Sequence, residues 1–246
     1  MSKTIGIIAL KGGVGKTSTV ANLGASLASD FKKKVLLIDG NFSTPHLGLH
    51  TGLLNPNKTI HHVLSSEMNP FEAVHESPAG FHIIPGAMNS WEVNPLLLKE
   101  KINALKENYD YILIDSSPSL NDELYSTMNA SDEIYVVTSP DYPTITSTLH
   151  AIKIAKDKGF PISGLIINRF RNKKFEINPK LIQKTSGIKI AGIIPEEEKV
   201  LEALSAMTPV TVYSPRRKVS KSYRNLAKVL MGRKKSVGFL NKILNP

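Results

Sequence analysis

The fold of this chain is decided by the heptapeptide Lys11-Gly12-Gly13-Val14-Gly15-Lys16-Thr17. An apolar run that ends at Leu10 precedes it, and a helical pattern over residues 16–29 follows it. Glycines allow successive backbone N–H groups to turn inward around phosphate oxygens, where a Cβ would block the approach. The helix that follows presents unpaired N–H groups to the same anion. This order of strand, glycine loop, lysine and helix predicts a phosphate-binding loop.

The residue types within the loop suggest separate roles. We expect Lys16 to reach the β- and γ-phosphates of ATP and the Thr17 hydroxyl to coordinate Mg²⁺. The usual pattern has a glycine where this chain has Leu10, and this chain carries an additional lysine at position 11. The residues predicted to bind the cofactor here are Gly12, Gly13, Val14, Gly15, Lys16, Thr17 and Ser18.

Working outward from the loop, short apolar runs alternate with helical patterns. Several of the runs are rich in Ile and Val, which is typical of parallel strands covered on both faces. The alternation predicts an α/β fold, a doubly wound and mostly parallel sheet flanked by helices. We expect strands at 4–10, 35–39, 81–85, 111–115, 134–138, 164–168 and 188–194, and helices near 16–29, 94–107, 121–129, 143–158, 196–207 and 217–231.

Two of the predicted strands end in carboxylates. Asp39 closes one strand and is followed by Asn41, and Asp115 closes another. The carboxyl ends of parallel strands face the ligand crevice of such a sheet. Asp39 and Asp115, with Thr17, are therefore the predicted metal residues.

The loop resembles the deviant Walker motif of the MinD/ParA family of P-loop ATPases, K-G-G-x-G-K-[ST], and the resemblance extends over roughly residues 3–231. It is closest to MinD-like proteins and implies the P-loop NTPase fold. In that family the first lysine, here Lys11, reaches across a homodimer interface to the partner's nucleotide. The resemblance therefore implies Lys11, Lys16 and the residue at position 41 as the catalytic groups.

Position 41 departs from the family, which has Asp-x-Asp where this chain has Asp39-Gly40-Asn41. The second Asp of the family orients the attacking water, and an amide cannot accept a proton as a carboxylate can. Slow turnover, a different group that positions the water, and an engineered substitution that traps ATP all remain open. The resemblance also implies that the nucleotide base lies against Asn168, Arg169, Pro195 and Glu196.

The composition restricts the class of protein. The chain has 246 residues and no cysteine, which excludes a disulfide scaffold, a thiolate metal site and a cysteine nucleophile. No apolar run approaches the roughly 20 residues needed to span a bilayer, and the start lacks a signal-peptide cleavage site. We therefore expect a cytoplasmic protein.

Charge is concentrated at the carboxyl end. Residues 214–246 contain ten basic residues and no acidic one, which leaves 21 basic and 21 acidic residues in the rest of the chain. A neutral body with a basic end predicts a polyanionic partner. We expect a P-loop ATPase domain over 1–231 and a basic amphipathic tail over 232–246.

The tail has the pattern of an amphipathic helix that lies in a membrane surface. At about 100° per residue, apolar and basic side chains separate onto opposite sides, as expected for a helix that enters the acyl boundary beside anionic headgroups. The predicted membrane residues are Val237, Phe239, Leu240, Ile243 and Leu244, with Lys234, Lys235 and Lys242.

Two functions are therefore consistent with the sequence. The favoured one is a MinD-like spatial regulator that dimerises with Mg²⁺ and ATP, binds the inner face of the cell membrane reversibly, and is reset by hydrolysis with the help of an activating protein. The alternative is a ParA-like DNA-segregation ATPase whose dimer binds DNA non-specifically through the basic end.

Overall fold

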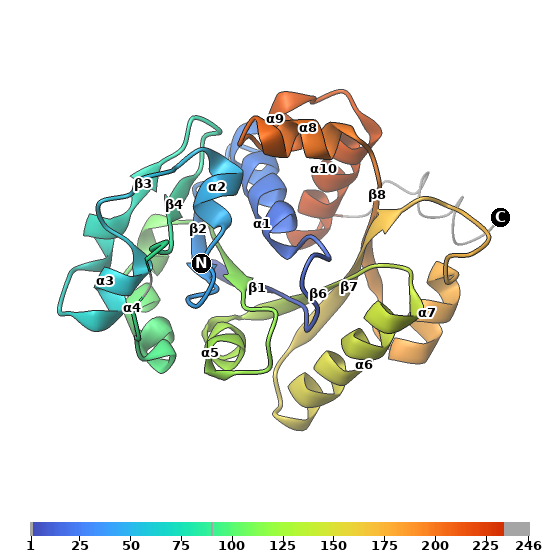
Figure 1. Ribbon diagram of the computed structural model, residues 1–246, viewed down its shortest axis with the longest axis horizontal. Helices are drawn as coiled ribbons and strands as arrows, with labels where there is room; N and C mark the ends of the chain where they lie inside the picture. The colour runs from blue at the N-terminus through green and yellow to red at the C-terminus, as the bar shows by residue number, and fades with distance from the viewer. Residues whose placement is uncertain (1, 90, 234–246) are drawn as a thin grey trace.

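An eight-stranded sheet covered by helices on both faces forms the centre of the protein (Figure 1). The computed structural model describes residues 2–89 and 91–233. Across the sheet the order is β3-β4-β2-β5-β1-β6-β7-β8. The strands are β1 (Lys3–Ile8), β2 (Val35–Gly40), β3 (His75–Glu76), β4 (His82–Ile84), β5 (Tyr111–Ser116), β6 (Glu133–Thr138), β7 (Ile162–Phe170) and β8 (Ile190–Pro195).

Helices divide between the two faces because alternate strand residues point to opposite sides. Leu37 and Leu113 pack with the layer that contains α1 and α10, whereas Leu36 and Ile112 pack with the layer that contains α3 and α4. The helices are α1 (Lys16–Ala25), α2 (Leu47–Thr51), α3 (Ile60–Ser65), α4 (Leu98–Asn103), α5 (Asp122–Ala130), α6 (Tyr142–Asp157), α7 (Pro179–Ser186), α8 (Lys199–Ser205), α9 (Val210–Tyr213) and α10 (Lys218–Leu230).

The predicted doubly wound sheet is confirmed. Every strand pair is parallel except β3 with β4, so the sheet is mostly parallel. All six residues of β2 are buried, which explains its unbroken apolar run. The sequence did not reveal β3, which has only two residues.

The topology positions the loop. β1 lies between β5 and β6; the chain runs from β1 to β2 on one side, and later crosses from β5 to β6 on the other side. Ligands of open α/β sheets bind where the strand order reverses, outside the carboxyl ends. The loop after β1 and the ends of β2 and β5 therefore meet at one edge.

The helices differ from the prediction in their boundaries and number. The helix predicted at 94–107 is divided into a 3₁₀ turn over Pro95–Leu97, the short α4, and a second 3₁₀ turn over Lys106–Asn108. Asn94 caps the first turn by accepting a hydrogen bond from the Leu96 N–H at 3.1 Å. The short helices α2, α3, α7 and α9 were not predicted, because so few residues show little periodicity.

The last described helix belongs to the folded domain. Val219, Tyr223, Leu226 and Leu230 of α10 are buried, and Gly232 follows in a left-handed conformation with φ 72°. The tail residues assigned to a membrane, from Lys234 onward, lie outside the described residues. Within the described part of the chain, none of the helices has both the length and the apolar character needed to cross a bilayer.

Candidate nucleotide-binding site

The loop between β1 and α1 is shaped by glycine. Gly13 and Gly15 have φ of 75° and 93°, conformations that side chains with a Cβ rarely adopt. At Gly15 a Cβ would also lie 2.1 Å from Nδ2 of Asn168, so no larger residue fits. The Gly15 carbonyl accepts hydrogen bonds from the Thr19 N–H and hydroxyl, which fixes the start of α1.

Asn168 connects β7 to this loop. Its side chain is buried and donates a hydrogen bond from Nδ2 to the Val14 carbonyl at 2.8 Å. The contact explains why β7 and the loop approach so closely at Gly15. Its suggested role as a reader of the nucleotide base stays a prediction.

Lys16 and Asp115 are both buried near the loop and interact electrostatically. Burial lowers the pKa of Lys16, and the charge of Asp115 opposes that shift. Burial raises the pKa of Asp115 to about 6, while a hydrogen bond from Thr17 and the charge of Lys16 act in the other direction. Three groups predicted from two distant segments therefore meet in one place.

Asp115 has a carboxylate oxygen available to coordinate a metal ion. Its Oδ1 is buried and has no hydrogen-bond partner among the residues that the structure describes. The part of the chain that the structure describes contains no group of three or more His, Asp or Glu side chains that could hold a metal alone. Mg²⁺ is commonly bound by one or two carboxylates together with substrate phosphates. The Asp115 carboxylate and the Thr17 hydroxyl fit such a partly assembled magnesium site.

Asp39 differs from Asp115, although the two are register partners on adjacent strands. Its two oxygens accept hydrogen bonds from the backbone N–H groups of Leu47, at 2.9 Å, and Asn41, at 3.2 Å. Burial, followed by the charge of Asp115, raises the pKa of Asp39 well above its usual range. In this conformation Asp39 holds the 41–47 loop, and its role as a metal residue stays a prediction.

Asn41 is also engaged within its own loop. Its Nδ2 donates to the carbonyl of Thr44 and, at 3.1 Å, to the Thr44 hydroxyl. The same hydroxyl donates to Oδ1 of Asn41 at 3.2 Å. Both ends of the amide are thus used to close the turn.

The 41–47 loop also forms hydrogen bonds with α5, which the sequence did not suggest. Ser43 donates from its backbone N–H, at 3.1 Å, and from its hydroxyl to Oε1 of Glu123 on α5. Glu123 is buried, and its second oxygen has no partner. Since no motif marks Glu123, only the packing of α5 against the loop reveals this contact.

The side chain of Lys11 contacts residues of its own chain. Its Nζ donates to the Thr144 hydroxyl at 2.8 Å and lies 3.5 Å from Oδ1 of Asp141. Asp141 is the N-cap of α6 and accepts a hydrogen bond from the Thr144 N–H. The lysine predicted to act on a partner is therefore restrained in cis in this conformation.

A pocket of about 460 Å³ opens beside the loop. The sequence missed the contributions of Val200, Leu201 and Leu204, which form an apolar wall, and of Tyr223 on α10. The apolar spacing in the predicted helix at 196–207 was the available signal. The predicted residues that line the pocket are Gly15, Ser18, Asn168, Arg169, Pro195 and Glu196.

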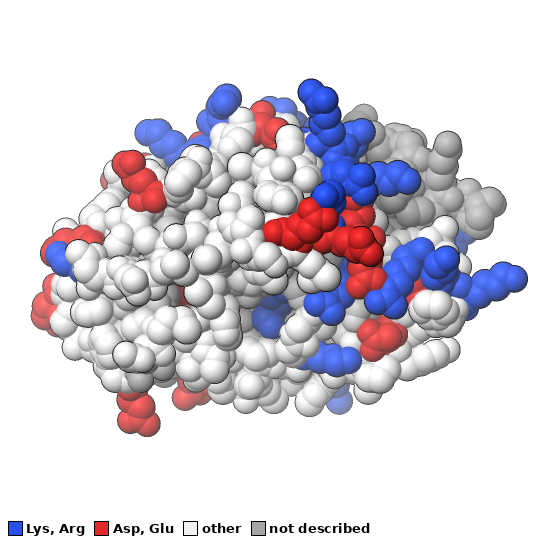
Figure 2. All heavy atoms as spheres, turned by 45° about the horizontal axis from the view of Figure 1, so that its top comes forward, with Lys and Arg blue, Asp and Glu red and all other residues white. Residues whose placement is uncertain are grey.

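The charges around this pocket are largely paired. Arg171 binds Glu196, and Arg217 donates to Glu197 at 2.9 Å. In Figure 2, acidic and basic side chains accordingly lie together on the right-hand half of the view. The pocket thus combines an apolar wall and a glycine loop with a rim of mixed charge, an arrangement suited to a nucleotide.

The sheet topology, the loop and the buried Lys16 and Asp115 define a P-loop nucleoside triphosphatase. Residues 2–158 match the AAA domain family, and residues 94–240 match the NifH/frxC family of 4Fe-4S iron–sulfur cluster binding proteins. The chain belongs to the MinD/ParA family of P-loop ATPases. A cluster of the NifH kind is held by cysteine thiolates, and this sequence contains no cysteine.

Three relatives illustrate the membership. The chromosome partitioning protein ParA of Caulobacter vibrioides is 30% identical over 95% of this chain and 95% of its own. The septum site-determining protein MinD of Thermotoga maritima is 29% identical over 94% and 89%. The structure of MinD from Pyrococcus horikoshii complexed with Mg-ADP has a TM-score of 0.88 and 31% identity, with 94% of this chain and 96% of that chain covered.

The raised pKa of Asp115 predicts a stability that depends on pH. Because the folded state holds this proton more tightly than the unfolded chain, the ionised carboxylate destabilises the fold above about pH 6, and the penalty fades as the pH falls toward 3.8. Without nucleotide, we expect Asp115→Asn to raise the free energy of unfolding by about 1–3 kcal/mol near neutral pH and to have little effect near pH ~4. Urea unfolding at several pH values measures this.

The exposed carboxylate of Asp122 provides the control. Asp122→Asn removes an acidic residue from the first turn of α5 and should change the free energy of unfolding by at most about 0.3–1 kcal/mol. A stabilisation by Asp115→Asn that persists unchanged near pH ~4 would show that its cause is not the titration of Asp115.

Proposed function

We propose that this chain is a MinD-like spatial regulator that closes into a homodimer around Mg-ATP and binds an anionic membrane surface through residues 232–246. ATP hydrolysis, stimulated by an activating protein, resets the cycle. The protein is then cytoplasmic when monomeric and peripheral on the inner face of the membrane when dimeric. The observation that carries the proposal is the meeting of Lys16, Thr17 and the unpartnered Asp115 oxygen beneath a glycine loop.

The roles at the nucleotide follow from this arrangement. Lys16 and the first-turn N–H groups of α1 bind the phosphates, since the helix N-terminus carries unpaired donors. Bound Mg²⁺ supplies Lewis-acid neutralisation of the phosphate charge. Thr17 and Asp115 hold its coordination shell, and the pocket beside Asn168 receives the base. The Pyrococcus horikoshii relative complexed with Mg-ADP supports this assignment.

The membrane is favoured as the polyanion because the tail carries apolar residues as well as charge. Phe239, Leu240 and Ile243 would enter the acyl boundary while lysines meet the headgroups. DNA offers no apolar layer to these side chains. Because a chromosome partitioning protein ParA is among the relatives, non-specific DNA binding is the alternative to membrane binding.

Removal of residues 234–246 tests the membrane proposal. With Mg-ATP, we expect the full chain to sediment with phosphatidylglycerol vesicles and the truncated chain to stay in the supernatant, because one short helix binds weakly and two in a dimer bind by effective concentration. Light scattering checks that the truncated chain still dimerises. Equal sedimentation of both chains would contradict the proposal, and retention of plasmid DNA by the full chain alone would favour the ParA-like function.

The contacts of Lys11 predict a restraint on dimerisation. Asp141→Asn keeps an N-cap acceptor for α6 and removes the charge beside Lys11. Exposed ion pairs contribute about 0.2–1 kcal/mol, so half-maximal dimer formation should need up to about fivefold less ATP. Light scattering over an ATP titration measures the shift, with Asp157→Asn at the other end of α6 as the control. A requirement for more ATP would show that Asp141 supports the dimer instead.

The amide at position 41 predicts slow hydrolysis. Asn41→Asp restores a proton acceptor, and a carboxylate cannot donate to the Thr44 carbonyl, so the turn should open. We expect phosphate release to rise at least tenfold (about 10²–10⁴-fold is typical of general-base groups). Asn41→Ala opens the turn without supplying a base and serves as the control. Equal turnover in the wild-type protein and in Asn41→Asp would show that the residue at position 41 does not limit the rate of hydrolysis.

A further inference from the structure

The described chain ends at the amino edge of the sheet, opposite the nucleotide site. Arg233, the last described residue, places its guanidinium 5.7 Å from the ring centroid of Phe31. Phe31 follows the π-helix Ser26–Asp30 that continues from α1, and the chain then leads into β2. Burial raises the pKa of Tyr111, at the start of β5, and the charges of Lys3 and Arg233 oppose this, which places Arg233 at the same edge.

Basic residues surround this exit point. Lys32 follows Phe31 in a left-handed conformation, with φ 55°, and is exposed together with Lys34. Arg224 and Lys228 lie one turn apart on α10, and the Arg233 N–H donates to the Lys228 carbonyl at 2.9 Å. We define the amino-edge patch as Lys32, Lys33, Lys34, Arg224, Lys228 and Arg233.

Only part of this positive charge is neutralised. Lys33 lies 3.8 Å from Asp110, and Arg224 donates to Asp30 at 3.0 Å. Over residues 2–89 and 91–233, no ion pair engages the four other cations of the patch, which are Lys32, Lys34, Lys228 and Arg233.

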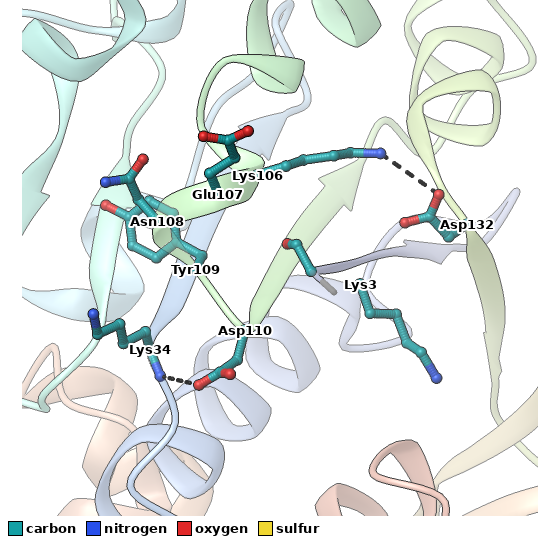
Figure 3. Close-up of a pocket in the computed structure, with 9 residues that line it drawn as sticks. Lys3, Lys34, Lys106, Glu107, Asn108, Tyr109, Asp110 and Asp132 are labelled. Atoms are coloured by element: carbon teal, nitrogen blue, oxygen red, sulfur yellow. Dashed lines mark hydrogen bonds and ion pairs between the residues drawn. The ribbon is translucent and has the colours of Figure 1, made fainter.

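The neighbouring pocket has a different charge balance. It has a volume of about 930 Å³ and is shown in Figure 3. There Lys106 pairs with Asp132, and Asp110 accepts a hydrogen bond from the backbone N–H of Lys34, whose ammonium group points away from that carboxylate. Three basic and three acidic residues line the pocket, and one of the basic residues, Lys34, is also a member of the patch.

The length of the tail fixes how far this patch can lie from the membrane. Val237, the first apolar residue of the predicted membrane helix, is four positions after Arg233. At about 3.3–3.6 Å per residue, these four positions span at most about 14 Å. Electrostatic attraction acts over a Debye length of about 8 Å at physiological ionic strength. A tail inserted in a membrane therefore brings the amino edge of the sheet close to the headgroups.

We propose that the amino-edge patch is a second membrane contact, which binds anionic phospholipid headgroups while the tail inserts. The inference rests on the proposed membrane function and adds a folded surface to it. Anionic phospholipid is favoured over DNA, because the patch adjoins a segment whose apolar residues require an acyl layer. The patch orients each bound subunit with its amino edge toward the bilayer.

Charge reversal at two unpaired lysines tests the patch in the full chain. With Mg-ATP and phosphatidylglycerol vesicles, Lys32→Glu combined with Lys34→Glu should lower vesicle affinity about 25-fold or more. Each cation near such a surface contributes about 1 kcal/mol, which is equivalent to roughly fivefold. The difference should shrink as salt is raised, and ATP-dependent dimerisation should be unchanged.

A matched pair on the other face of the sheet is the control. Lys99 on α4 and Lys153 on α6 are exposed and unpaired within the described residues. Reversal of both to Glu makes the same change in net charge, and we expect less than about a threefold loss of affinity from it.

The outcomes separate the patch from the tail. If both reversed pairs weaken binding equally while the tail-truncated chain stays unbound, the patch proposal fails and the proposed function stands. If the wild-type chain does not bind the vesicles, both fail. If the Lys32 and Lys34 reversal abolishes plasmid binding and spares vesicle binding, the patch contacts DNA and the lipid proposal is overturned.

Discussion

The burial of Lys16 against Asp115 is the constraint on which the rest of the site depends. A lysine and a carboxylate are costly to bury, and they remain together only where geometry compensates for lost hydration. Here the compensation is incomplete, because one Asp115 oxygen has no partner and its pKa is raised to about 6. The site thus keeps an unsatisfied charge at the position where a metal and phosphates would neutralise it.

Around this pair, the groups expected to act on the nucleotide are occupied by their own chain. Lys11 binds Asp141 and Thr144, and Asn41 closes its turn through Thr44. The Lys11–Asp141 pair is partly exposed to solvent, so it can be exchanged for a ligand or a partner at small cost. We interpret the conformation as a resting state whose residues are near their places of action but engaged elsewhere.

The two ends of the sheet carry different chemistry. The carboxyl edge holds the glycine loop and a pocket at which Glu196 and Glu197 form ion pairs with Arg171 and Arg217. The amino edge holds Arg233, after which the tail begins, and basic residues such as Lys32 and Lys34 that form no ion pair within the described residues. Because α1 and α10 run between these edges and pack on each other, the fold offers a rigid connection between a nucleotide site and a surface-binding site.

The sequence by itself predicted the doubly wound sheet, the glycine loop and the position of Asp115 at the carboxyl end of a strand, because strand periodicity and a glycine loop are local patterns. It could not determine the Glu123 contact with Ser43, the cis contacts of Lys11 or the amino-edge patch. These depend on which side chains neighbouring elements bring together across long separations in the chain. Such contacts are set by the packing of layers, and no spacing of residues encodes them.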